Sequence, residues 1–222
     1  MRQVEVEQNG FEMVAKVFSA EECARIIGEI GVVDGPGKRG LLRNPAIVEL
    51  AHSQKIMELA AWHLEPAPIP VRGIYFDKSP DVNWLVAWHQ DLTIAVQRQA
   101  AVVGFGPWSL KEGIPHVQPP IDYLSKMLTV RIHLDDADEE NGALRVLPGS
   151  HRQGRLTAKQ IEELVVQNSF VTCRACKGDV LLMRPLLLHA SGRSESNRRR
   201  RILHIEYAGF DLPPPLAWNG LA

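Results

Sequence analysis

The sequence predicts a mainly β protein of the α+β class. Its core is expected to be a jelly roll, the double-stranded β-helix of cupin-like proteins, flanked by N-terminal helices. Two helix-forming segments precede about eight short segments of strand character, an order typical of a helix-flanked double sheet. The 222 residues can bury a sizeable core, so we expect one domain over residues 1–222, helical at about 1–66 and jelly roll at about 70–210.

The helical part begins with a capping-box sequence. Ser19 is followed three residues later by Glu22, and an isoleucine stripe continues the amphipathic pattern. After a glycine-rich break, a second helix is expected from residue 44 or 45 to about residue 64, before Pro66. A short helix inserted among the strands is expected from the Thr157 cap to about residue 167.

Strand character continues from there to the C-terminal part. The expected strands are residues 71–77, 84–91, 128–135, 143–147, 170–176, 179–183, 186–189 and 202–207, and the last two should pair as a hairpin. Residues 129–135 alternate polar and apolar side chains, so one face must be buried. Arg131, His133 and Asp135 on the other face are expected to have structural or substrate-shaping roles.

His89 and Asp91 lie two residues apart after a strongly apolar and aromatic segment, and His189 follows a hundred residues later. Alternate residues of a strand point to one side, so His89 and Asp91 can bind one ion while a neighbouring strand supplies His189. Two imidazoles and one carboxylate leave open metal positions for substrates, as non-heme Fe(II) oxygenases require. These three residues are our candidate metal ligands and catalytic residues.

A histidine followed two residues later by an acid occurs four times, whereas eight histidines and 26 acidic residues would give about one such pair by chance, so the spacing alone does not identify metal ligands. One of the other pairs, His63 with Glu65, falls at the end of the expected helix, and the remaining two are His133 with Asp135 and His204 with Glu206. We prefer His89 and Asp91 because apolar residues precede them. Of the three pairs in expected strands, this one lies farthest upstream of His189, which leaves room for several intervening strands.

Four consecutive arginines, Arg198 to Arg201, follow His189 and a turn. Such a run is ordinarily a solvated basic surface or a nucleic-acid patch. Alternation separates its members, however, because Arg201 shares a face with apolar residues that should pack under helices, while Arg200 then points into the polar interior. There, eleven residues after His189, Arg200 can hold a carboxylate through two parallel hydrogen bonds.

Four sequence elements occur in an order that resembles a known family. They are WHQDL, NGALRVLPGSHRQG, GDVLLMRPLLLHASG and RRRRILHIEYA, between about Arg72 and Ala208. Together they look like the phytanoyl-CoA dioxygenase family of Fe(II)/2-oxoglutarate oxygenases. The resemblance implies that His89, Asp91 and His189 bind Fe(II).

The resemblance also implies 2-oxoglutarate and O2 as cosubstrates, and hydroxylation of a small organic molecule with release of succinate and CO2. Arg200 would pair with the far carboxylate of 2-oxoglutarate, and Ser191 would add a hydroxyl contact. Related iron halogenases lack a carboxylate at the position of Asp91, so this chain is similar to hydroxylases or desaturases. Substrates differ widely within the family, and its name does not establish a CoA substrate here.

The segment between Gln97 and Asp122 is the least regular and directly follows the candidate metal strand. Segments of this length without regular structure are usually functional or mobile. We therefore expect a lid that selects the substrate, with Trp108, His116 and Gln118 as contacts. A surface excursion anchored by a buried tryptophan is the alternative.

Composition is that of an ordinary globular enzyme. The net charge of −1 gives no general attraction to nucleic acid or membrane surfaces. No apolar segment has transmembrane length, and no signal-peptide pattern opens the chain. Three cysteines make an incomplete disulfide set, which is typical of a reducing compartment. We expect a cytoplasmic protein with a small-molecule substrate and no nucleic-acid or membrane partner, in an oligomeric state that the sequence leaves open.

Two other functions are compatible with the same pattern. A cupin-like pocket with zinc or another divalent metal can serve hydrolysis or isomerisation, but it needs no basic residue opposite the metal. A non-enzymatic barrel that binds a small molecule is the second alternative, since a fold alone does not determine a function. The combination of three metal ligands with Arg200 favours the oxygenase over both.

Overall fold

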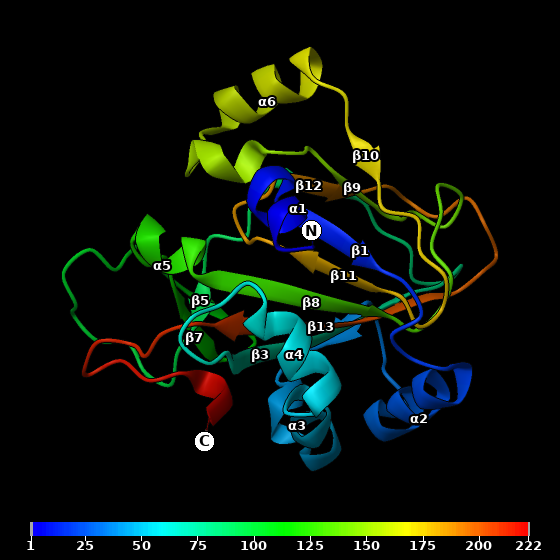
Figure 1. Ribbon diagram of the computed structural model, residues 1–222, viewed down its shortest axis with the longest axis horizontal. Coiled ribbons are helices and arrows are strands. Elements are labelled where there is room, and N and C mark those ends of the chain that lie inside the picture. The colour runs from blue at the N-terminus through cyan, green and yellow to red at the C-terminus, as the bar shows by residue number, and fades with distance from the viewer. Residues whose placement is uncertain (1, 222) are drawn as a thin grey trace.

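Two larger antiparallel sheets and a small third sheet form the core of the computed structural model, which describes residues 2–221 (Figure 1). The large sheet has the order β1 (Phe11–Val14), β11 (Val180–Met183), β8 (Met127–His133), β13 (Arg200–Ala208), β3 (Ile69–Lys78) and β2 (Gly37–Lys38). The second sheet has the order β10 (Val171–Thr172), β9 (Leu144–Val146), β12 (His189–Ser191) and β4 (Val86–His89). The third has the order β5 (Ile94–Ala95), β7 (Ile114–Val117) and β6 (Trp108–Lys111).

Helices cover the large sheet and the ends of the sheets (Figure 1). The α-helices are α1 (Arg2–Asn9), α2 (Ala20–Ile30), α3 (Pro45–Ala51), α4 (Gln54–Ala61), α5 (Ile121–Ser125) and α6 (Ala158–Gln167). Short 3-10 helices are η1 (Leu41–Arg43), η2 (Ser150–Gln153) and η3 (Asn219–Leu221). Within residues 2–221, no helix combines the length and the apolar character needed to cross a membrane. The antiparallel sheets and the helices that flank them confirm the predicted mainly β, helix-flanked jelly roll.

The outer face of β13 packs against the helices. Leu203, Ile205 and Tyr207 are fully buried in one apolar cluster with side chains of α2, α3 and α4. The Tyr207 hydroxyl donates a hydrogen bond of 2.8 Å to the Ala51 carbonyl, which ties β13 to the end of α3. The alternation predicted for this strand is confirmed, and its opposite face is left for the space between the sheets.

The N-terminal part differs from the expectation in two respects. The Ser19 capping box is present and α2 follows it as predicted, but the expected helix at 44–64 is two helices. Ser53 has an extended backbone (φ −61, ψ 143) and begins α4, so α3 ends before it. The part expected to be helical also contains β1, which pairs with β11 at the edge of the large sheet.

The C-terminal strands also differ from the expectation. Residues 186–188 are buried but form a turn, so β12 begins at His189 instead of ending there. The expected hairpin is absent because β12 pairs with β4 and β9, whereas β13 pairs with β3 and β8 in the other sheet. The chain therefore crosses from one sheet to the other between His189 and Arg200, which places these two side chains on facing walls.

Gly178 occupies a position that no other residue can take without strain. Its φ is +92, and a Cβ added there would lie 2.0 Å from the Phe18 carbonyl oxygen. We expect Gly178→Ala to lower the free energy of unfolding by at least about 2 kcal/mol, measured by urea denaturation. Gly31→Ala is the matched control, because Gly31 has a φ of +75 and open space around it. An equal decrease in the free energy of unfolding in both variants would show that the close approach of the new Cβ to the Phe18 carbonyl does not destabilise the fold.

Candidate metal centre and cosubstrate pocket

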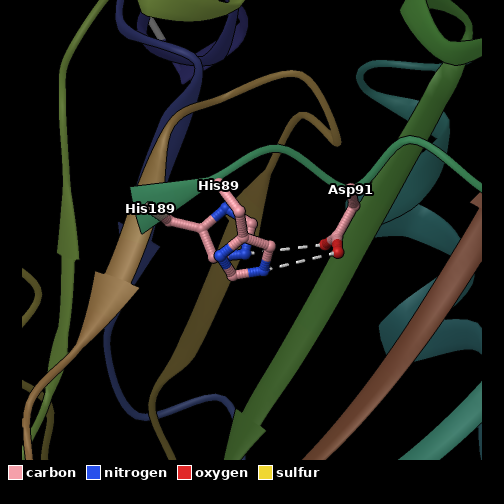
Figure 2. Close-up of side chains that lie close together, drawn as sticks. All are labelled: His89, Asp91 and His189. Carbon is pink, nitrogen blue, oxygen red and sulfur yellow. Dashed lines mark ion pairs between the residues drawn. The ribbon is translucent and has the colours of Figure 1, made fainter. Parts of the chain in front are cut away.

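The three candidate ligands converge between the two sheets (Figure 2). His89 and His189 are register partners on β4 and β12, and their ring centroids are 4.1 Å apart. Asp91 lies two residues beyond the end of β4, where its N–H donates a 2.9 Å hydrogen bond to the Pro185 carbonyl. Its carboxylate oxygens lie 3.9 Å from His89 Nε2 and 3.7 Å from His189 Nε2. The expectation that one strand carries both His89 and Asp91 is therefore wrong, because Asp91 comes from the following bend.

Both imidazoles are held with Nε2 toward the carboxylate. His89 Nδ1 lies 2.9 Å from the Ala87 carbonyl oxygen, and His189 Nδ1 lies 2.8 Å from the Leu187 carbonyl oxygen. A carbonyl only accepts, so each Nδ1 must carry the hydrogen and each neutral ring keeps its lone pair on Nε2. Burial lowers the pKa of His189 to about 4, although Asp91 opposes this, so the ring is neutral near pH 7.

The donor atoms fit one divalent ion. One possible ligand atom from each of the three residues lies within 4.8 Å of the other two. Donors that share an ion at about 2.1 Å are at most about 4.2 Å apart, so small side-chain shifts bring all three to one ion. A second group that also could hold an ion combines Asp91 with His204 and Glu206. Two members of this group already interact with other side chains. Glu206 forms an ion pair with Arg72, and His204 Nε2 lies 3.2 Å from Glu206 Oε1. The triad of His89, Asp91 and His189 is the better fit.

Gln90, between the two ligands of this segment, fixes the bend. Its side-chain amide donates to the Leu186 carbonyl at 2.7 Å and to the Gly154 carbonyl at 2.8 Å, and its oxygen accepts from Leu156 N–H at 2.9 Å. Three backbone bonds on one side chain are hard to infer from sequence, because their partners are distant along the chain. They explain how Asp91 is positioned outside a strand.

A cavity of about 360 Å³ contains the triad together with Arg200 and Ser191. Arg200 is buried, and its guanidinium lies 3.3 Å from the Ser191 hydroxyl. Lys78, the register partner of Arg200, is also buried, with its ammonium 3.2 Å from the same hydroxyl and 2.6 Å from the Gly192 carbonyl. Arg200, Ser191 and Lys78 thus form a cationic corner beside the cavity.

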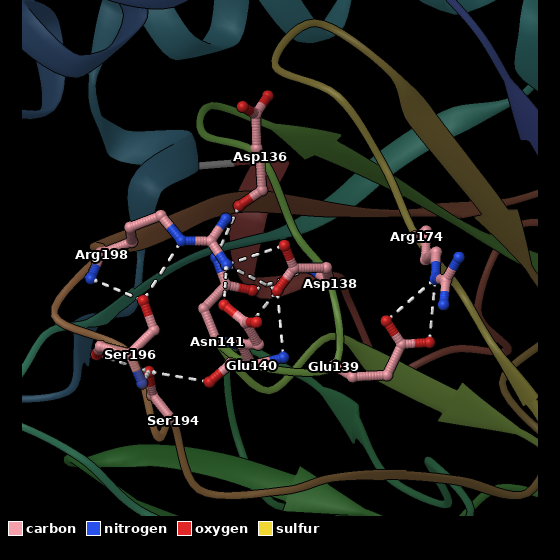
Figure 3. A network of polar contacts seen from close by, with 9 residues as sticks. All are labelled: Asp136, Asp138, Glu139, Glu140, Asn141, Arg174, Ser194, Ser196 and Arg198. Atoms are coloured by element: carbon pink, nitrogen blue, oxygen red, sulfur yellow. Dashed lines mark hydrogen bonds and ion pairs between the residues drawn. The ribbon is translucent and has the colours of Figure 1, made fainter.

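The four consecutive arginines have different surroundings. Three of them form ion pairs: Arg198 with Asp138 at 2.7 Å (Figure 3), Arg199 with Asp77 at 2.6 Å and Arg201 with Asp135 at 2.7 Å. Among the ion pairs of residues 2–221, none involves Arg200. Burial, with a smaller effect of Arg131, lowers the pKa of Arg200 to about 9, so it remains a cation at neutral pH. It is a buried cation without a carboxylate partner of its own.

The four residues predicted to contact the substrate divide into two groups. Arg131 lines the cavity, whereas Trp108, His116 and Gln118 lie outside its lining. His116 is 1 % exposed and bonds to its own strand at the Ile114 carbonyl, and Trp108 packs on an apolar cluster. The expectation that this segment lacks regular structure is wrong, because it contains the β6–β7 hairpin.

The β6–β7 hairpin brings Lys111 to the cavity, a residue that the sequence reasoning missed. Glu112 and Gly113 form its two-residue turn, both with positive φ (51 and 78). Glycine is typical of the second position of such a turn, but the first position usually holds Asn, Asp or Gly, so Glu112 hides the hairpin in the sequence. Thr93 also lines the cavity and accepts a 3.1 Å hydrogen bond from the Lys111 ammonium.

Comparison with known proteins identifies the family of this chain. The family model for phytanoyl-CoA dioxygenase matches residues 6–202, which is most of the chain. The chain belongs to the phytanoyl-CoA dioxygenase family. Membership confirms the class expected from the sequence, a non-heme Fe(II)- and 2-oxoglutarate-dependent dioxygenase.

Two curated relatives of this phytanoyl-CoA dioxygenase family member have different names. A probable alpha-ketoglutarate-dependent hypophosphite dioxygenase of Stutzerimonas stutzeri is 29 % identical over 97 % of this chain and 80 % of its own length. The phytanoyl-CoA dioxygenase domain-containing protein 1 of Danio rerio is 23 % identical over 78 % of this chain, which spans 57 % of that protein.

Solved structures show the same fold at low sequence identity. EctD from S. alaskensis, crystallised with 2-oxoglutarate and 5-hydroxyectoine, has a TM-score of 0.71 and 17 % identity over 93 % of this chain and 74 % of its own. The non-heme alpha ketoglutarate dependent carbocyclase SnoK has a TM-score of 0.68 and 17 % identity over 94 % of this chain and 83 % of its own. At this identity the likeness concerns the jelly roll and not the substrate.

Proposed function

We propose that this protein binds Fe(II) through His89, Asp91 and His189 and hydroxylates a small organic substrate at the expense of 2-oxoglutarate and O2. The observation that carries the proposal is Arg200, a buried cation that lacks a carboxylate and shares a cavity with three convergent metal donors. 2-Oxoglutarate has a keto acid at one end, which suits a metal ion, and a carboxylate at the other end, which suits Arg200. A hydrolytic metal site gives no reason to bury Arg200.

Each residue of the pocket has a defined part in this proposal. His89, Asp91 and His189 would hold the ion, and Arg200 with Ser191 would bind the far carboxylate of 2-oxoglutarate. Iron with its cosubstrate supplies the oxidising power for an unactivated C–H bond. The apolar side chains Ile74, Phe76 and Leu144 line the same cavity and exclude water from it.

The test is to measure succinate release and O2 consumption by the purified protein with Fe(II) and 2-oxoglutarate. Slow succinate formation is expected without substrate, and a metabolite screen should find compounds that accelerate it. Omission of 2-oxoglutarate or replacement of Fe(II) by Zn(II) should abolish the reaction. Turnover of a substrate with Zn(II) in the absence of O2 would contradict the proposal and favour a hydrolase or isomerase.

We also propose that the whole chain forms one catalytic domain and acts in the cytoplasm on a small molecule. The contact of α3 and α4 with β13 in one apolar cluster supports the first part, since the helices have no separate core of their own among the described residues. Limited proteolysis is the check: removal of residues 1–66 should abolish both folding and Fe(II) binding.

A further inference from the structure

The cavity is lined by much more positive than negative charge. Its cationic lining residues are Arg39, Arg72, Lys111, Arg131 and Arg200. Among the described lining residues, Asp91 is the only carboxylate. Arg39 and Arg72 form ion pairs with Glu112 and Glu206, so they are neutralised from outside the lining. The proposed function uses Arg200 alone and leaves Lys111 and Arg131 without a role.

The cations occupy two separate regions of the cavity. On β13, Arg200 and Glu206 are six residues apart, and Arg72 is the register partner of Glu206 on β3. Six residues of a strand extend about 20 Å. A five-carbon dicarboxylate that reaches from the triad to Arg200 is too short to reach Arg72 as well. The region around Arg72 is therefore available to a different molecule.

Lys111 belongs to the Arg72 region. The charged groups that act most on its ammonium are Arg72 and Arg39, then Asp91 and Glu206, and the pKa of Lys111 is lowered by burial and by the two arginines. Its hydrogen bond is to Thr93, a neutral hydroxyl two residues after Asp91. Among the ion pairs described for residues 2–221, none involves Lys111.

Arg131 lies between the two regions. It is the register partner of His204 and donates to His204 Nδ1 at 3.0 Å, while its buried Nε has no hydrogen-bond partner among the described residues. If Fe(II) and 2-oxoglutarate cancel each other's charge, Asp91, whose charge acts on Arg131, is the one carboxylate of the described lining against Arg131, Arg200 and Lys111. Arg131 is buried and Lys111 is half-buried, and cations removed from water are stabilised by a negative partner, so this part of the cavity favours a ligand that carries negative charge.

We infer that Lys111 and Arg131 bind the anionic group of the primary substrate, which is a small molecule with an oxyanion such as a carboxylate or a phosphonate. The inference rests on the proposed function, because it assigns the Arg200 corner to 2-oxoglutarate. A dianionic phosphonate matches both cations, whereas a carboxylate matches one of them. Binding at the Thr93 side of the cavity brings the rest of the substrate close to Asp91 and hence to the metal.

Anaerobic isothermal titration calorimetry on protein loaded with Fe(II) and saturating 2-oxoglutarate tests this site. The probes are ethylphosphonate, propionate and the uncharged propionamide. Ethylphosphonate should bind most tightly, and propionamide at least about tenfold more weakly than propionate. Lys111→Met should weaken binding of both anions at least about tenfold, and Lys111→Arg should keep most of it.

The control is Lys159→Met, which removes an exposed lysine of α6 and should change no dissociation constant. Lys111→Met should leave the affinity for 2-oxoglutarate unchanged. Equal binding of propionate and propionamide, absence of anion binding, or a parallel loss of 2-oxoglutarate affinity in Lys111→Met would overturn the anion site. Failure of the unmodified protein to bind 2-oxoglutarate in the presence of Fe(II) would instead refute the proposed function, and the anion site with it.

Discussion

Asp91→Ala is expected to abolish both Fe(II) binding and 2-oxoglutarate-dependent succinate release. The change leaves two neutral imidazoles and no negative charge beside the ion, and hard divalent ions need the carboxylate for affinity. The loss should exceed the roughly 10- to 100-fold that changes to outer-shell partners of metal ligands cost. Anaerobic Fe(II) titration measures it directly, and circular dichroism checks that the variant is folded.

Two histidines with the same spacing to an acid provide the comparison. His133→Ala should retain Fe(II), because His133 belongs to no group of possible ligands within residues 2–221. His204→Ala should retain it too, since the ring already contacts Arg131 and Glu206. Loss of Fe(II) in His204→Ala but not in a His189→Ala variant would move the metal to the second group of possible ligands and refute the triad.

Long strands account for what the sequence predicted correctly. β13 is nine residues long, with apolar residues against the helices on one face, so its alternation alone placed Arg200 toward the interior. Sequence context distinguishes the four pairs of a histidine with an acid two residues later, and it favours His89 and Asp91. Their convergence with His189 agrees with that preference.

Short strands and long-range contacts account for what was missed. β12 has three residues, and the apolar residues 186–188 before it resemble a strand although they form a buried turn. Periodicity cannot separate the two over so few residues. The passage of the chain from one sheet to the other between β12 and β13 likewise depends on pairing with strands that are distant in the sequence. The sequence does not predict the position of Lys111, because the turn beside it has glutamate at Glu112, where hairpin turns usually have Asn, Asp or Gly.

Arg200→Ala is expected to raise the dissociation constant of 2-oxoglutarate by tens of fold or more at unchanged Fe(II) affinity. A charged bidentate contact typically contributes a few kcal/mol, and the burial of Arg200 removes the competition of water for it. Calorimetric titration of the Fe(II)-loaded protein with 2-oxoglutarate is the measurement. Ser191→Ala should have a smaller effect, because it removes a neutral hydroxyl and leaves the cation in place.

Substitution of the neighbouring arginines tests whether the loss of 2-oxoglutarate affinity is specific to Arg200. Arg199 and Arg201 hold Asp77 and Asp135, away from the cavity lining, so Arg199→Ala and Arg201→Ala should leave the affinity for 2-oxoglutarate unchanged. Each of the three substitutions removes one positive charge from the same strand region, so a general basic surface would respond equally to all of them. A loss confined to Arg200→Ala therefore requires a directed contact, and equal losses at all three positions would show that no such contact exists.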